Sequence, residues 1–502
     1  MKKITFTALF VFLGLLSCNK DFLTVVPETN LSTAIFFNKE ADFQQAVNAT
    51  YVPLRAIIND RAWLLGEMHS DNAYYYRNIL FGATEQQEDI ADFAIPMANG
   101  VTSNTHVLNQ YRLDYQIIAR ANQVLSAIDA VEFPAASKNN LKGQAQFLRA
   151  YAYFELVQYF GKVPMHLTPV TNRQEAALPL ATVDEVYAQI IKDASAAITG
   201  LLPKPTQEAG RVTSGTAKML LANVYVVRKN WAEAEKLLKE IVASNEYKLM
   251  PDFNDAFSTT TGNKNNAESI FEVQFQEGAS GYNGTLMYNY LPRPMSPDEL
   301  RPISGTSNPQ PLTGEGNGAP TPDLIASYAI GDKRKDATIG TVTISGSLRA
   351  NKTFPYNKKF AKSHSLHTNT GNNIPIYRYA ETLLYLAEAL TEQGKMGEAL
   401  PFLNQVRLRA GLPAATATAQ AALRTQIYQD RRSELAFENK RWFDLVRTGT
   451  AVEIITAYGN RIKANPVSYY YPEGAVPRSN AFTNISLLYG LPADEAALSP
   501  FF

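Results

Sequence analysis

The feature that most constrains the fold of this chain is a helical hairpin pattern that occurs twice. Two alanines and one leucine of the first copy recur 165 positions later (387 − 222 = 165): Ala222, Ala234 and Leu238 match Ala387, Ala399 and Leu403. Small residues at such positions let two antiparallel helices approach closely, and the leucines fill the seam between them. The pattern predicts tetratricopeptide-like helix pairs, which stack and bury a shared core.

Apolar residues spaced three to four apart extend the helical prediction to much of the chain. The helices predicted in this way cover residues 111–131, 141–160, 183–201, 213–228, 231–244, 378–393, 396–409 and 421–446. Between residues 254 and 373, glycine and proline are frequent, and only residues 269–275 and 339–344 have the β-branched and apolar character of strands. The sequence therefore predicts an all-α repeat scaffold with a loop-rich region that carries little strand.

The N-terminus has the features of an export signal. A basic start precedes an apolar run over residues 8–16 that is too short to span a bilayer, and Ser17 stands before Cys18, the only cysteine. The sequence 15–18 resembles a bacterial lipobox. We predict a signal peptide over residues 1–17, a lipid anchor on Cys18, and a tether and N-terminal arm over residues 18–33. An ordinary secretory signal with a chance cysteine is the alternative.

Composition and motifs argue against several functional classes. Lys+Arg and Asp+Glu both number 47, so the net charge is +0. This balance lacks the excess of basic residues that is typical of nucleic-acid-binding proteins. His364 and His367 lack a neighbouring carboxylate and are interpreted as solvated loop residues. Residues 314–318 are glycine-rich but lack the Gly-Lys-Ser/Thr ending of a phosphate loop, so we interpret them as flexible loop. We predict no catalytic residues, cofactor or metal, although the sequence leaves calcium binding open.

A charged segment near the C-terminus has two interpretations. Acidic and basic residues interleave there at helical spacing: Arg431, Arg432, Glu434, Glu438, Arg441, Asp444 and Arg447. One interpretation is a charged active-site helix. We favour the other, a network of ion pairs with neighbouring elements, in which Trp442 and Leu435 pack inward.

Two clusters of aromatic and polar residues form the candidate ligand site. The first cluster contains Asp71, Asn72, Tyr74, Tyr75, Tyr76 and Arg77, with Trp63 nearby, and the second contains Tyr282, Tyr288 and Tyr290. A flat ring stacks on the C–H face of a sugar or on an extended peptide, while the polar groups bind hydroxyls or termini. Three consecutive tyrosines cannot all face one way in regular structure, so we expect at least one to pack inward. Core packing of the tyrosines is the alternative.

Four stretches of sequence, taken together, resemble the SusD/RagB family of outer-membrane nutrient-binding lipoproteins. They are Cys18 with residues 21–23 and Pro27, residues 145–164, residues 377–411 and residues 431–449. The resemblance implies a SusD-like fold on four tetratricopeptide-like units. It also implies helical parts over residues 34–253 and 374–502, with a variable ligand-binding region over residues 254–373. The last residues, 498–502, depart from the usual ending of the family and put the C-terminal packing in doubt.

The resemblance also implies a function and a partner. Such a protein is anchored by lipid in the outer membrane, faces the cell exterior, and captures oligosaccharides for a SusC-like TonB-dependent β-barrel transporter. Oligopeptide binding within the same uptake architecture is the first alternative. A glycoside hydrolase and a scaffold without a small ligand are further alternatives.

Overall fold

The computed structural model describes residues 36–61, 63–77, 85–257, 264–314, 316–345 and 351–501. The predicted signal peptide, the predicted lipidation site Cys18 and the predicted arm over residues 18–33 lie outside the described residues. Within the described part, every helix is too short or too polar to cross a membrane.

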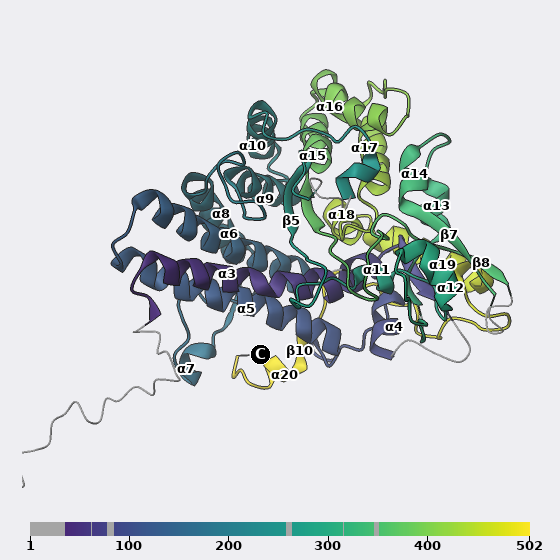
Figure 1. Ribbon diagram of the computed structural model, residues 1–502, viewed down its shortest axis with the longest axis horizontal. Helices are drawn as coiled ribbons and strands as arrows, with labels where there is room; N and C mark the ends of the chain where they lie inside the picture. Colours follow the sequence, from purple (N-terminus) through teal and green to yellow (C-terminus); the bar gives the residue numbers. More distant parts are fainter. Residues whose placement is uncertain are drawn as a thin grey trace, which may run out of the picture.

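Long helices form the scaffold, and all but the last of them pack in a continuous series (Figure 1). They are α3 (Glu40–Ala56), α5 (Thr105–Ala127), α6 (Ala135–Phe160), α8 (Val183–Gly200), α9 (Ser214–Val227), α10 (Trp231–Ala243), α15 (Tyr379–Glu392), α16 (Met396–Arg409), α17 (Gln420–Leu435) and α19 (Ala451–Ala464). Contacts run from α3 through α5, α6, α8, α9, α10 and α15 to α16 and α17. The predicted helical repeat scaffold is confirmed, although the sequence patterns revealed neither α3 nor α19.

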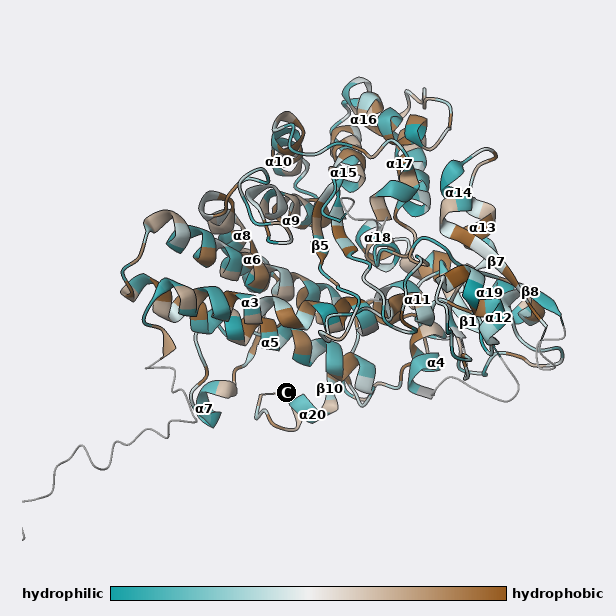
Figure 2. Cartoon of the chain, in the orientation of Figure 1, coloured by the Kyte–Doolittle hydropathy of each residue, from teal (hydrophilic) through white to brown (hydrophobic). Residues whose placement is uncertain are grey.

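The two copies of the repeated pattern form the hairpins α9–α10 and α15–α16. The matched alanines and leucines of both copies are fully buried, as the close approach of the helices requires. Helix α10 packs against α15, so the second hairpin stacks on the first. The Thr213 side chain accepts a hydrogen bond from the Thr216 amide and fixes the start of α9. Figure 2 shows hydrophobic and hydrophilic residues on the same helices, as expected for helices with one face in the core.

The helix predicted over residues 421–446 is interrupted in the structure. Helix α17 ends at Leu435, and α18 (Arg441–Thr448) begins after the five intervening residues 436–440. Phe437 and Asn439 have positive φ angles, of 67° and 58°, that an α-helix does not accommodate. The buried Glu67 carboxylate accepts hydrogen bonds from the amides of both residues, at 2.9 and 3.1 Å. A contact from a distant part of the chain therefore stabilises the break.

Short two-stranded sheets occur along the chain, and two of them pair a strand of residues 254–373 with a strand outside that region. The strands are β1 (Ala73–Tyr76), β2 (Val101–Thr102), β3 (Val163–Pro164), β4 (Leu180–Ala181), β5 (Ser269–Val273), β6 (Gly316–Pro320), β7 (Ile339–Ile344), β8 (Lys352–Asn357), β9 (Ile374–Arg378) and β10 (Leu491–Pro492). The pairs β1–β6, β3–β4, β5–β9 and β7–β8 are antiparallel, and β2–β10 is parallel. Both strands predicted from the sequence, β5 and β7, are confirmed.

Short helices and turns complete the loop-rich region and the connections. They are α4 (Glu85–Ala91), α7 (Arg173–Ala176), α11 (Leu286–Asn289), α12 (Pro297–Ser304), α13 (Pro322–Ser327), α14 (Lys333–Thr338) and α20 (Ala493–Ala496), with π-helical turns at Ile57–Arg61 and Trp63–Met68. The interpretation of residues 314–318 as flexible loop was wrong for Gly316–Gly318, which belong to β6. Their glycines let β6 pass close to aromatic rings, because a Cβ on Gly316 would lie 2.7 Å from the Tyr76 ring.

Buried ion pairs connect the C-terminal helices to the rest of the fold, as the second interpretation of the charged segment predicted. Arg378 binds Glu438 at 2.7 Å, Glu434 at 3.0 Å and Glu268 at 2.5 Å, and all four side chains are almost fully buried. Trp442 and Leu435 pack in the core. Glu268 precedes β5 and Arg378 ends β9, so this network links the loop-rich region to α17.

Candidate ligand-binding site

The tyrosines of the first predicted cluster lie in the core. Tyr74, Tyr75 and Tyr76 lie in β1 and have 0% exposure. The Tyr74 hydroxyl donates to Asp92 Oδ1 at 2.5 Å, and the Tyr76 hydroxyl donates to the carbonyl of Pro355 at 2.6 Å. A ring that is enclosed by other side chains offers no face to a ligand. The structure therefore corrects the predicted stacking role of these three residues, and the core-packing alternative describes them.

The polar members of the first cluster bind other protein groups. The Asp71 carboxylate accepts from Arg441 at 2.7 and 3.0 Å and pairs with Arg432 at 2.9 Å. Burial alone would raise the pKa of Asp71, but the two arginines outweigh it and lower this pKa to about 2. Asn72 accepts from Arg432, and Arg77 pairs with Asp92. Asp71 and Asn72 hold the segment before β1 against α17 and α18, whereas Arg77 joins the end of β1 to Asp92, which follows α4. These side chains are not free for a ligand.

Most of the second predicted cluster is buried as well. The Tyr288 hydroxyl lies 2.6 Å from Nε2 of His364, and Tyr290 packs near Trp63, with 6.2 Å between ring centroids. Tyr288, Tyr290 and Trp63 are each at most 5% exposed. His364 is also buried, which corrects its interpretation as a solvated loop residue.

In the described ranges, no group of three or more His, Cys, Asp or Glu side chains is arranged to hold a metal ion.

Tyr282 is the one predicted site residue whose ring is well exposed, at 48%. The Arg55 guanidinium lies 4.4 Å from the centre of this ring, in cation–π contact. Arg55 also lines a groove of about 190 Å³, together with Asn48, Arg211 and Gln274. The groove lies between α3, the turn at residues 209–211, and β5. Tyr282 and this groove, named the Tyr282 surface below, combine a ring with a cation and an amide at one place.

Sequence reasoning missed Arg55 because it missed α3. A signal was present, since Phe43, Val47 and Leu54 follow a helical spacing and all three are buried. Recognising α3 would have placed Arg55 in the last turn of a helix, but it would not have shown that Arg55 contacts Tyr282. The pair forms across 227 positions (282 − 55 = 227), and no local pattern reports such a contact.

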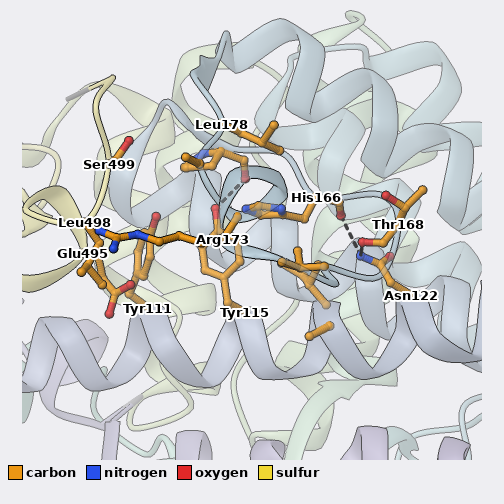
Figure 3. Close-up of a pocket in the computed structure, with 16 residues that line it drawn as sticks. Tyr111, Tyr115, Asn122, His166, Thr168, Arg173, Leu178, Glu495, Leu498 and Ser499 are labelled. Atoms are coloured by element: carbon orange, nitrogen blue, oxygen red, sulfur yellow. Dashed lines mark hydrogen bonds between the residues drawn. The ribbon is translucent and has the colours of Figure 1, made fainter. Parts of the chain in front are cut away.

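A larger cavity, of about 510 Å³, lies between α5, residues 164–178 and the C-terminal segment (Figure 3). The rings of Tyr111 and Tyr115 form part of its wall, with 4.7 Å between their centroids. The Tyr115 hydroxyl donates to the Pro164 carbonyl at 2.6 Å, and the Asn122 amide donates to the His166 carbonyl at 3.0 Å. This space is named the α5 cavity below. Both tyrosines lie within the helix that the sequence predicts over residues 111–131.

Family comparisons connect both ends of the chain to SusD-like proteins. The model of the SusD family matches residues 332–499. The model described as "Starch-binding associating with outer membrane" matches residues 21–226. SusD-like protein P2 of Formosa agariphila is 26% identical over 534 residues, which cover 99% of this chain and 97% of the relative.

Solved structures with the same architecture include proteins named for glycan binding. Surface glycan-binding protein A from Bacteroides uniformis is 25% identical, with a TM-score of 0.71, over 92% of this chain and 99% of that one. A SusD-like carbohydrate binding protein from Bacteroides fragilis superposes with a TM-score of 0.76 at 21% identity, over 93% and 99% of the two chains. These relatives are named as binding proteins and not as enzymes.

Proposed function

Because the chain belongs to the SusD family, we propose that it is a cell-surface lipoprotein that captures oligosaccharides and delivers them to a SusC-like TonB-dependent transporter of the outer membrane. The match to a starch-binding, outer-membrane-associated family and the likeness to a surface glycan-binding protein support a glycan as the ligand. The lipid anchor is assigned to Cys18. The protein acts by binding and release, and the transporter performs the transport.

The Tyr282 surface is the proposed point of glycan contact. The observation that carries this assignment is the exposed Tyr282 ring, which the Arg55 guanidinium contacts from 4.4 Å. A sugar ring presents a C–H face that stacks on tyrosine, and its hydroxyls accept hydrogen bonds from arginine and amide donors. Arg55 and Asn48 supply such donors at the groove. A Tyr ring held by a neighbouring cation loses little conformational freedom on binding, which favours affinity.

Calorimetric titration of the lipid-free mature protein tests the proposal. The ligands are a panel of soluble oligosaccharides and, separately, a set of tryptic oligopeptides. The variant is Tyr282→Ala, and the matched control is Tyr225→Ala, which removes a half-buried ring from α9, away from the groove. We expect one class of oligosaccharide to bind, and we expect Tyr282→Ala to weaken that binding at least about tenfold, in line with one lost aromatic contact and its burial.

Three results have different meanings. Glycan binding that Tyr282→Ala leaves unchanged would refute the site but keep the function. Peptide binding without glycan binding would replace the function by oligopeptide capture, the first alternative of the sequence analysis. Turnover of a glycan by the purified protein would contradict the non-enzymatic proposal. Thermal melting of each variant shows whether a loss of binding reflects a loss of fold.

A further inference from the structure

The α5 cavity differs chemically from the Tyr282 surface. Its volume of about 510 Å³ falls within the range of small-molecule pockets, which is about 300 to 1,000 Å³. Apolar side chains from all three bounding segments line it, including Ile118, Pro164, Val170, Leu178 and Leu498. The cavity therefore favours a ligand with an apolar body.

Most polar groups of the α5 cavity already have partners inside the protein. Tyr115 and Asn122 donate to carbonyls of residues 164–168 and hold that segment against α5. Glu495 accepts from Arg112 at 2.6 Å, and this ion pair fixes the C-terminal segment to α5. Few groups remain to bind the many hydroxyls of a sugar.

Of the two charged residues that line the cavity, Glu495 is paired within the described part of the chain and Arg173 is not. It begins α7 and lines the α5 cavity, and Figure 3 shows its side chain extending across the space toward Glu495 and Leu498. Over the ranges that the structure describes, its guanidinium has no hydrogen bond and no ion pair. His166 adds no charge at neutral pH, because burial lowers its pKa further below the neutral range. The cavity thus pairs an apolar wall with one unpaired cation.

We infer that the α5 cavity is a second binding site, which takes an amphipathic monocarboxylate: an apolar ring or chain with a carboxylate at one end. The apolar part occupies the space beside Tyr111 and Tyr115, and the carboxylate binds the Arg173 guanidinium, which matches a carboxylate in a bidentate geometry. A free organic acid and the C-terminal end of a peptide both have this chemistry. The inference does not depend on the proposed glycan function.

The test is a titration with a pair of probes that differ in charge alone. Indole-3-acetate carries the carboxylate, and indole-3-acetamide is its neutral counterpart. The tripeptide Gly-Gly-Phe, with a free or an amidated C-terminus, forms the second pair and separates the two sources of the carboxylate. We expect at least one acid to bind saturably and its amide to bind at least about tenfold more weakly, because a charge-assisted hydrogen bond is lost.

Variants place the binding in the cavity. Arg173→Gln should reduce acid binding to the level of the amide, whereas Arg301→Gln, which removes another exposed arginine, from α12, should have no effect. Ala177→Trp and Ala119→Trp fill the cavity from opposite walls, and each should abolish binding. Two blocking variants are used so that one folded variant remains for the test if the other fails to fold.

Several outcomes would overturn the inference. The first is that neither acid binds saturably, and the second is that an acid and its amide bind with equal affinity. The others are an unchanged affinity for the acid in Arg173→Gln and binding of the acid that persists in a folded blocking variant. Binding of the tripeptide acid alone would support the site and identify a peptide C-terminus as its ligand. Binding of indole-3-acetate alone would identify a free acid.

Discussion

Replacing Glu155 by glutamine is expected to stabilise the protein at pH 8 but not at pH 4. Glu155 lies on α6 and is buried, and burial raises its pKa from 4.5 to about 7 against a smaller opposing effect of Lys440. Asp114 on the neighbouring helix α5 is also buried, and its pKa is raised by burial and further by the Glu155 charge. The core between α5 and α6 therefore disfavours negative charge.

The sign and size of the effect follow from the two pKa values. Because the folded pKa exceeds the unfolded one, the folded state binds more protons between pH 4.5 and 7, and stability falls as the pH rises through that window. The two values differ by about 2.5 (7 − 4.5), and each pH unit corresponds to about 1.4 kcal/mol, so the loss above pH 7 is about 3 kcal/mol. Glutamine keeps the shape and removes this loss.

Urea denaturation followed by helical circular dichroism at pH 4, 6 and 8 measures the change. We expect Glu155→Gln to gain about 3 kcal/mol at pH 8 and almost nothing at pH 4, where the glutamate is neutral in the folded state. Glu233→Gln, at an exposed position of α10, is the control and should show no such pH dependence. An equal gain at both pH values, or a loss at pH 8, would refute the reasoning.

Three further substitutions test the assignments made above. Arg378→Met leaves three buried carboxylates with fewer partners and should lower the free energy of unfolding by about 3 to 5 kcal/mol, which the urea midpoint reports. Tyr76→Ala opens a cavity in the core and should cost about 3 to 5 kcal/mol, seen as a lower melting temperature, whereas a ligand-contacting tyrosine would change binding alone. Asp71→Asn should reduce stability at pH 7 but not at pH 2, because the lowered pKa of Asp71 makes its contribution disappear as the pH falls from about 4 to 2.

The helical scaffold was predictable because its signals are local. An amphipathic spacing over fifteen residues reports a helix, and the repeated alanines reported the hairpins α9–α10 and α15–α16. The break between α17 and α18 was not predictable in this way. Residues 436–440 fit the helical pattern, and the positive φ angles there are stabilised by Glu67, which lies 370 positions earlier than Phe437.

The candidate site was less predictable, because exposure is decided by distant segments. Tyr74 is covered by Tyr471 and Phe482, and Tyr76 by Phe354 and Tyr470, none of which is near β1 in sequence. The residue types of the first cluster suited a ligand, but they suited the core equally well. Tyr282 has the same residue type but stays 48% exposed, with the Arg55 guanidinium against its ring.

The two proposed sites can be separated by one crossed experiment. The Tyr282 surface has polar donors beside an exposed ring, whereas the α5 cavity has an apolar wall with one unpaired cation. Tyr282→Ala should therefore weaken glycan binding and leave the organic acid unaffected, and Arg173→Gln should do the reverse. If either variant weakened both ligands without a loss of fold, the two sites would be coupled, and the assignment of each ligand to a separate surface would be wrong.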